Sequence, residues 1–161
     1  MKNIIKVGMA DLNICKTPDV LTTLGLGSCV GICLVDPVTK IAGLAHIMLP
    51  DSTQIKNNEN IAKFADTATV KLIDDMVKLG ASRSRLVAKI AGGAQMFGFQ
   101  SQNNLMKIGE RNVAASKEML QRLNIPLLAE DTGKNYGRTI EFYPENGQLL
   151  IKTIGKENRI I

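Results

Sequence analysis

The stretch that decides the fold is residues 29–49, which read CVGICLVDPVTKIAGLAHIML. Two β-prone apolar runs, Val30–Val35 and Ile41–Leu49, flank the turn signal Asp36-Pro37, and this pattern predicts a β-hairpin. If the hairpin closes symmetrically near its turn, Cys29 faces His46 across the two strands. A register slip of one residue would instead place these two side chains on opposite faces of the sheet.

The pairing of Cys29 with His46 points to a nucleophilic cysteine, because a neighbouring imidazole can generate and hold a thiolate. Such a thiolate is expected to react well below the ordinary thiol pKa of about 8.5. His46 is the single histidine of the chain, so no other histidine can be the base. The alternatives are an inert buried cysteine after a tight turn and a hydrogen-bonded core histidine.

Two glycines, Gly25 and Gly27, precede the cysteine. Glycine allows positive φ, so the N–H groups of this corner can point at a reacting carbonyl oxygen. A third group is needed to orient the imidazole, and no aspartate is obviously placed for that role. Thr23, six residues before Cys29, is the candidate through its hydroxyl; the residue pattern alone favours an ordinary β-branched strand residue.

Two helices are predicted from apolar residues at helical spacing. The first covers 61–79, with Asn60 as its N-cap and Gly80 as its end. The second covers about 110–123, and its apolar stripe consists of three residues: Val113, Leu120 and Leu123.

Further strands are predicted over 3–9, 20–24, 86–91, 126–129, 138–143 and 148–154. The last two flank Asn146-Gly147, a strong hairpin signal. Together these elements predict an α/β (α+β) fold, a single domain over residues 1–161 with a mostly antiparallel sheet and two main helices.

Composition excludes several classes of protein. The net charge is +5, but the positive charges are scattered and no basic run contains interleaved aromatic residues, which argues against nucleic-acid binding. No apolar run reaches the roughly 18 residues that span a membrane. Three cysteines and one histidine do not complete a typical zinc site, and Gly92-Gly93 lacks the spacing of a phosphate loop. We therefore expect a reduced cytoplasmic protein without metal or cofactor, in which Cys15 and Cys33 are structural.

Five blocks of the chain resemble the chemoreceptor glutamine deamidase family, CheD, in the same order over about residues 5–155. They are TLGLGSCVGICLVDP from Thr23, AGLAHIMLPDS from Ala42, KIAGGAQMF from Lys89, IGERNV from Ile108 and LLAEDTG from Leu127. The resemblance implies a layered α/β sandwich, similar to the catalytic domain of the cytotoxic necrotizing factor toxins. It also implies a cytoplasmic chemotaxis enzyme that converts receptor glutamines to glutamate and releases ammonia.

Carried over by motif, the family's catalytic cysteine, histidine and threonine correspond to Cys29, His46 and Thr23. The resemblance further implies a protein partner, the phosphatase CheC, for which Phe97 and Phe99 are candidate contacts. Two other functions remain open at this point: a non-catalytic binding module for CheC or a receptor helix, and a thiol hydrolase that acts on small amides.

Overall fold

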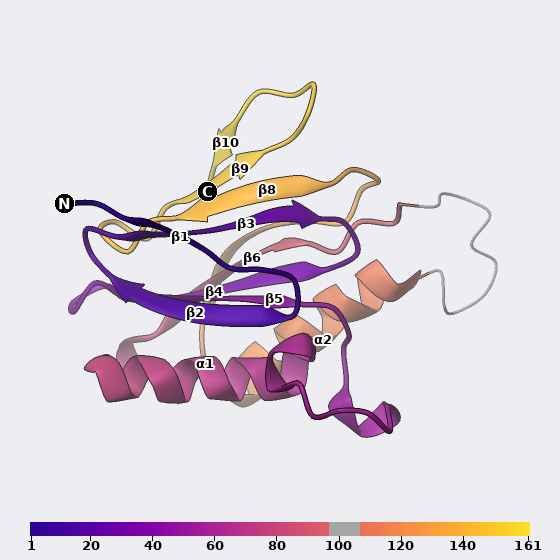
Figure 1. Ribbon diagram of the computed structural model, residues 1–161, viewed down its shortest axis with the longest axis horizontal. Helices are drawn as coiled ribbons and strands as arrows, with labels where there is room; N and C mark the ends of the chain where they lie inside the picture. The colour runs from indigo at the N-terminus through magenta and orange to yellow at the C-terminus, as the bar shows by residue number, and fades with distance from the viewer. Residues whose placement is uncertain (97–106) are drawn as a thin grey trace.

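Two β-sheets and a layer of two α-helices are stacked in three layers (Figure 1). The structure is a computed structural model, and it describes residues 1–96 and 107–161. Phe97 and Phe99 lie outside these described residues. The predicted α+β sandwich with two main helices is confirmed.

The outer sheet has the strand order β1-β3-β8-β9-β10, and its strands are β1 (Ile4–Lys6), β3 (Val20–Leu26), β8 (Arg138–Phe142), β9 (Leu149–Lys152) and β10 (Arg159–Ile160). The central sheet has the order β2-β5-β4-β6-β7, and its strands are β2 (Asp11–Lys16), β5 (Ile41–Ile47), β4 (Val30–Asp36), β6 (Val87–Gly92) and β7 (Leu127–Thr132). Pairing is mostly antiparallel, as the sequence predicted. The two parallel pairs are β1 with β3 and β6 with β7.

The helices cover the face of the central sheet that is turned away from the outer sheet (Figure 1). Helix α1 (Ala65–Leu79) packs on β2 and β5, and helix α2 (Ile108–Arg122) packs on β4, β6 and β7. Short 3-10 turns complete the structure: η1 (Ser52–Gln54), η2 (Ile61–Lys63) and η3 (Arg83–Arg85). In the described part of the chain, no helix is long and apolar enough to cross a bilayer.

Every residue of β4 and β5 is buried, because both faces of the central sheet are covered. Alternate side chains go to different cores. Ile32 and its neighbours two residues away pack against α1, whereas Cys33 and Leu44 pack between the two sheets with Phe142. Burial on both faces explains why these strands are continuous apolar runs in the sequence.

The β4–β5 hairpin forms as predicted, but its register differs by two residues. Asp36 pairs with Ile41 and Gly31 pairs with His46, so the predicted opposition of Cys29 and His46 is wrong. The reason is the turn, which has four residues because Asp36 accepts hydrogen bonds from Lys40 N and, through its carboxylate, from Val38 N. A shift of two preserves the face, so Cys29 and His46 remain on the same side of the sheet as diagonal neighbours.

Two boundaries follow tertiary contacts rather than local pattern. The predicted first strand over 3–9 is shortened to β1, and β2, which was not predicted, follows it in the other sheet. The predicted first helix begins later, at Ala65, because Leu49 pairs with Phe64 and draws the backbone there out of helical conformation. Asn60 caps η2 instead, and Gly80 ends α1 at a φ of 127° as expected.

Candidate active site

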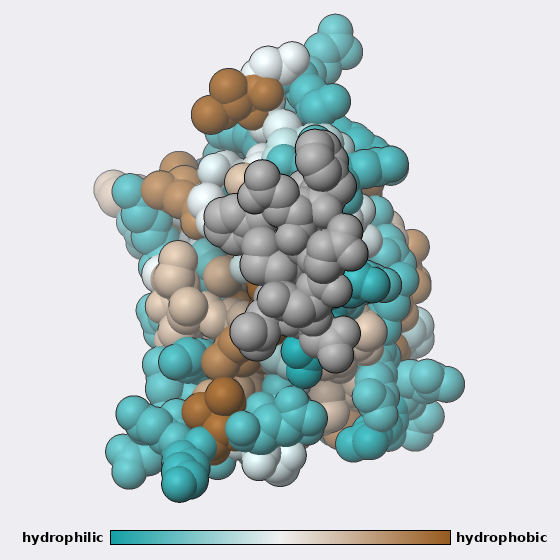
Figure 2. All heavy atoms as spheres, turned by 90° about the vertical axis from the view of Figure 1, so that its right-hand side faces the viewer, coloured by the Kyte–Doolittle hydropathy of each residue, from teal (hydrophilic) through white to brown (hydrophobic). Residues whose placement is uncertain are grey.

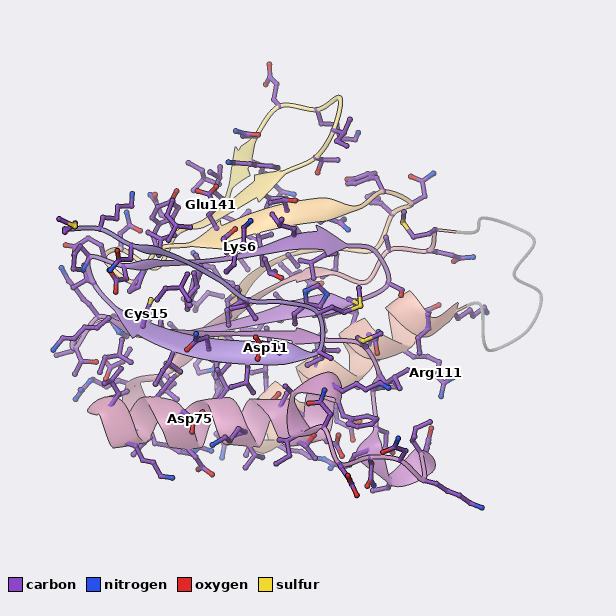
Figure 3. The ribbon with its side chains drawn as sticks, viewed as in Figure 1. Lys6, Asp11, Cys15, Asp75, Arg111 and Glu141 are labelled. Carbon is purple, nitrogen blue, oxygen red and sulfur yellow. The ribbon has the colours of Figure 1, made fainter. Side chains whose placement is uncertain are left out.

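Cys29, His46 and Thr23 come from three different segments that meet at one end of the interface between the sheets. Thr23 lies on β3 of the outer sheet, His46 lies near the end of β5 in the central sheet, and Cys29 lies in the turn that joins β3 to β4. In Figure 3, Asp11, which pairs with His46, marks this end of β2, and Cys15 lies toward the opposite end.

A buried hydrogen-bond chain orients the imidazole. The Thr23 hydroxyl donates to the carbonyl of Val7 at 2.7 Å, and the same oxygen lies 2.7 Å from Nδ1 of His46. A hydroxyl has one proton, so both contacts are satisfied only if His46 Nδ1–H donates to Thr23 Oγ1. This assigns the tautomer in which Nε2 carries the free lone pair. His46 Nε2 is buried and has no hydrogen-bond partner among the described residues, so it is available as a base.

The turn that carries Cys29 is held by backbone N–H groups just after β6. Gly93 N donates to the carbonyl of Cys29 and Ala94 N donates to the carbonyl of Gly27, both at 2.8 Å. Gly92 has a φ of 111°, and a Cβ on it would lie 2.3 Å from the Cys29 carbonyl oxygen. The backbones approach this closely only because no side chain intervenes. Gly92 and Gly93 therefore allow the close backbone contacts that hold the turn of Cys29.

The strand before the cysteine contains a bulge. Thr23 pairs with Ile140 and Leu26 pairs with Arg138, so β3 has one more residue than β8 between these pairs. Gly25 lies in the bulge with a φ of 66°, as the sequence predicted, whereas Gly27 does not have a positive φ. Bulges re-aim a strand near functional sites. Here the bulge follows Thr23 directly and leads into the turn that contains Cys29.

Burial disfavours the charged forms of both Cys29 and His46. Burial raises the pKa of the Cys29 thiol, although its own backbone N–H acts in the opposite direction, and burial lowers the pKa of His46. Cys29 is 7% exposed and His46 is 1% exposed. The structure therefore does not agree with the thiolate of low pKa that the sequence predicted, since desolvation outweighs any stabilisation of the charged pair. Cys29 Sγ and His46 Nε2 are not hydrogen-bonded to each other in this structure, so the two side chains share a face of the sheet without a direct bond. General-base catalysis requires a neutral imidazole that can accept the thiol proton.

Comparison with known protein sequences shows to which family the chain belongs. The sequence model described as CheD chemotactic sensory transduction matches residues 48–153. A probable chemoreceptor glutamine deamidase CheD of Lachnoclostridium phytofermentans is 65% identical over 161 residues, which is 100% of both chains. The chemoreceptor glutamine deamidase CheD of Halalkalibacterium halodurans is 56% identical over 155 residues, 96% of each chain. The chain belongs to the CheD family.

The other cysteines of this CheD-family chain lie in the packed region between the sheets. Cys15 and Cys33 are buried and free, and burial raises the pKa of Cys15 to about 12 and that of Cys33 further. A thiol with so high a pKa is a poor nucleophile at neutral pH. They pack as small apolar side chains, as the sequence predicted.

Three exposed apolar residues lie in segments next to the candidate site of this CheD-family protein. Met9 lies in the turn before β2, Leu24 follows Thr23, and the Met96 side chain lies close to Gly27; all three are substantially exposed. Figure 2 views this end of the molecule and shows hydrophobic residues interspersed with hydrophilic ones. Such a mixed surface suits contact with another protein.

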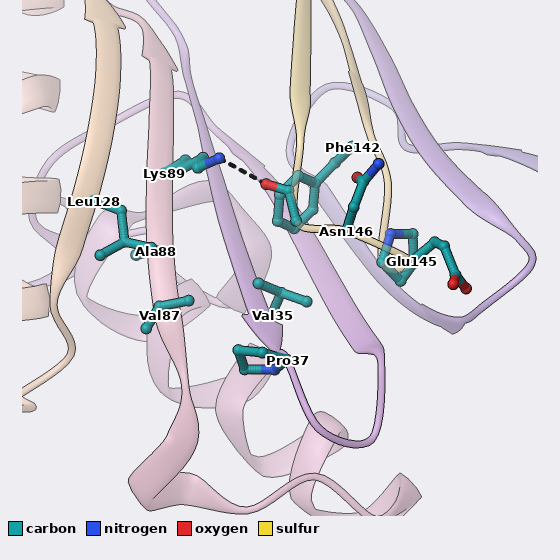
Figure 4. A pocket seen from close by; sticks show the side chains of 11 residues that line it. Val35, Pro37, Val87, Ala88, Lys89, Leu128, Phe142, Glu145 and Asn146 are labelled. Atoms are coloured by element: carbon teal, nitrogen blue, oxygen red, sulfur yellow. Dashed lines mark hydrogen bonds between the residues drawn. The ribbon is translucent and has the colours of Figure 1, made fainter. Parts of the chain in front are cut away.

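A separate cavity of about 190 Å³ lies between the sheets and contains none of the three site residues (Figure 4). Val35, Val87 and Phe142 line its apolar side, and Lys89 donates a hydrogen bond of 2.8 Å to the carbonyl of Gly147 at its edge. Because Val35 is at the far end of β4 from Cys29, this cavity is remote from the candidate active site.

The buried face of α2 differs from the predicted stripe. The sequence pattern selected Val113, Leu120 and Leu123, but the fully buried residues are small or polar except for the last: Gly109, Asn112, Ser116 and Leu120. These four recur at helical spacing, and that spacing is the signal by which they could have been found. The prediction included Leu120 and, as a small gap in the stripe, Ser116, but it missed Gly109 and Asn112 because the stripe was built on apolar residues.

Proposed function

We propose that this CheD-family protein is a protein-glutamine deamidase of chemoreceptors that uses Cys29 as its nucleophile. The names of its relatives supply the substrate class and the reaction. The assignment of residues rests on the two hydrogen bonds that link the Val7 carbonyl, the Thr23 hydroxyl and His46 Nδ1. They leave His46 Nε2 unprotonated, on the same face of the sheet as Cys29. We infer that the reaction requires the cysteine.

In the first step, His46 Nε2 accepts the proton of Cys29 as Sγ attacks the carboxamide carbon of a receptor glutamine. The resting pair is neutral, so proton transfer accompanies the attack. Negative charge develops on the amide oxygen. No carbonyl oxygen of the described residues accepts a hydrogen bond from the N–H of Ser28 or of Cys29, and we assign these two groups to the stabilisation of the oxyanion.

The tetrahedral intermediate then breaks its C–N bond. His46, now an imidazolium, gives its proton to the departing nitrogen, so that ammonia leaves and a thioester with Cys29 remains. A water molecule next donates a proton to His46 Nε2 as its oxygen attacks the thioester carbon. Collapse of this second intermediate releases glutamate and returns the proton to Cys29. The sum is one amide and one water converted to one carboxylic acid and ammonia.

Thr23 is a positioning residue in this scheme, because it acts through the imidazole and not on the substrate. Its hydroxyl accepts from Nδ1–H, and this bond becomes charge-assisted when His46 is protonated. The bond is therefore stronger in the transition state than in the resting enzyme, which is the condition for a contribution to rate.

We further propose a cytoplasmic location, since the receptor glutamines implied by the family are in cytoplasmic helices, and CheC as a second partner. Both proposals rest on the resemblance of the sequence blocks to the CheD family. The exposed apolar residues Met9, Leu24 and Met96 are available for contact with a receptor helix at the site.

The test is peptide mass spectrometry of a receptor cytoplasmic fragment after incubation with wild-type protein, Cys29→Ala or Cys33→Ala. Cys33 is the matched control, because it is a buried cysteine four residues away that packs without a role in the reaction. We expect amide-to-acid conversion at glutamine with wild type and Cys33→Ala and none with Cys29→Ala. Conversion by Cys29→Ala would remove the cysteine from the mechanism, and no conversion by wild type would favour a binding module.

A further inference from the structure

The side chain of Asn112 on α2 contacts both segments that carry the reactive groups. Asn112 is completely buried, and its Nδ2 donates to the carbonyls of Ser28 and Met48, each at 2.9 Å. Ser28 immediately precedes Cys29, and Met48 follows His46 by two residues. One amide group therefore joins the turn of the nucleophile to the strand of the base.

The link stands where the β-ladder ends. The last pair of β4 with β5 at this end is Val30 with Ile47, and the next register position would oppose Cys29 and Met48. Met48 N instead donates to the carbonyl of Lys63, so the two chains separate there. Two carbonyl oxygens cannot bond to each other, but a single NH₂ group can donate to both. Asn112 thus continues the connection beyond the final ladder pair.

The helix that carries Asn112 is firmly placed against the site. Gly109 lies one turn earlier on α2, close to the backbone of Gly93 and Ala94. A Cβ on Gly109 would lie 2.4 Å from the Ala94 carbonyl oxygen and 2.7 Å from that of Gly93. Since Gly93 and Ala94 bind the carbonyls of Cys29 and Gly27, helix, loop and turn form one rigid group. Figure 3 shows Arg111, the neighbour of Asn112, at this end of α2.

The side-chain oxygen of Asn112 distinguishes a linking role of the amide from simple packing. Asn112 Oδ1 is buried and has no hydrogen-bond partner among the described residues. Buried polar atoms are nearly always paired, so an asparagine used only to fill the contact of helix and sheet would be poorly suited to the position. The contacts that Asn112 makes here depend on the two N–H donors of its side-chain amide.

We propose that Asn112 is a positioning residue that sets the separation of Cys29 Sγ and His46 Nε2. The inference rests on the proposed deamidase mechanism for its effect on turnover, but its effect on the cysteine can be measured without a receptor. It also explains the IGERNV block of the sequence, in which Gly109 allows the close approach and Asn112 makes the link.

The test uses the full chain with Asn112→Ala, Ser116→Ala and His46→Ala, and the double variant of Asn112 and His46. Ser116 is the matched control, since it is equally buried one turn later on α2. Within the described part of the chain, its hydroxyl bonds only to the Asn112 carbonyl of the same helix. The alkylation rate of Cys29 by iodoacetamide is followed by peptide mass spectrometry across pH, with the thermal unfolding midpoint measured in parallel.

We expect Asn112→Ala to lower kcat on a receptor fragment about 10- to 100-fold with KM unchanged, because a misplacement of about 1 Å has an effect of this size. Alkylation at neutral pH should fall to the level of His46→Ala, and the double variant should fall no further. Ser116→Ala should retain wild-type rates. If Asn112→Ala does not fold, Asn112→Ser, which keeps one donor, should give an intermediate rate.

Multiplicative effects of the two substitutions on alkylation, or rates for Asn112→Ala equal to those of Ser116→Ala, would overturn the proposal. Failure of the wild-type protein to deamidate any receptor fragment would instead reject the proposed function. The alkylation rates would still test the positioning role in that case, because iodoacetamide replaces the receptor as the electrophile. Equal rates for Asn112→Ala, His46→Ala and the double variant would support it.

Discussion

Replacement of Thr23 by valine tests the hydrogen-bond chain directly. Valine has a similar shape but no hydroxyl, so Thr23→Val leaves the Val7 carbonyl and His46 Nδ1 without their partner in a region that is fully buried. The imidazole then loses both its preferred tautomer and its fixed orientation. We expect slower turnover in a protein that still folds.

The size of the effect follows from the change in this bond during the reaction. A bond between neutral groups contributes about 0.5–1.5 kcal/mol, and one to a charged group contributes about 1.5–3 kcal/mol. The gain on protonation of His46 is the difference between these two ranges, roughly 1–1.5 kcal/mol, which corresponds to a decrease in kcat of about 5- to 13-fold. Loss of His46 itself should have a larger effect, about 100- to 10,000-fold, as for general acid–base catalysis.

The assay is deamidation of a receptor fragment, with Thr22→Val as the matched control and Thr23→Ser as the rescue. Thr22 is the adjacent buried threonine and donates to the Ile140 carbonyl at 2.7 Å, but it does not contact His46. Both valine variants should lose stability, by roughly 1–3 kcal/mol for each buried group left unpaired. Only Thr23→Val should lose activity, and Thr23→Ser should recover it. Equal kcat for the two valine variants would refute the orienting role.

Three further predictions concern proton equilibria. His46 must be neutral to accept a proton and burial lowers its pKa below 6.5, so the acid limb of kcat/KM should lie below pH 6.5; a limb at higher pH would contradict the neutral resting pair. Burial raises the pKa of Cys29, so its alkylation without receptor should have a midpoint above about 8.5. Asp36 is fully buried against Arg85, which lowers its pKa, so Asp36→Asn should reduce the free energy of unfolding at pH 7 by about 2–3 kcal/mol. This stability is present above the unfolded pKa of about 3.9 and is lost as pH falls, so wild type and variant should converge under acid denaturation; a constant difference would contradict the assignment.

Strong local signals in the sequence predicted much of the fold. The β8–β9 hairpin forms at Asn146-Gly147, where Gly147 has a φ of 72° that asparagine-glycine turns favour. Helix α1 ends at Gly80, and β4 and β5 occupy the apolar runs on either side of Asp36. In each case the signal depends on residues adjacent in the chain, so no knowledge of distant contacts was needed.

The site was predicted only in part, because its geometry depends on contacts between distant residues. The pattern around Cys29 and the single histidine indicated which groups are chemically able to react, but not the register that places Gly31 opposite His46. The contact of Thr23 with His46 joins two sheets, so no spacing along the chain could indicate it. Asn112 was missed for the same reason, since its two acceptors lie 84 and 64 residues away in the sequence.

The sequence by itself determined the types of element, the apolar central strands and which side chains are chemically able to react, since backbone preference and side-chain chemistry are local properties. Tertiary structure alone decided the division of the N-terminal segment between two sheets, the start of α1 at Ala65 and the burial that disfavours the charged forms of Cys29 and His46. Those features depend on burial and on hydrogen-bond partners brought by other segments. Burial changes the pKa of both reactive groups of the candidate site, and burial exists only after the layers have packed together.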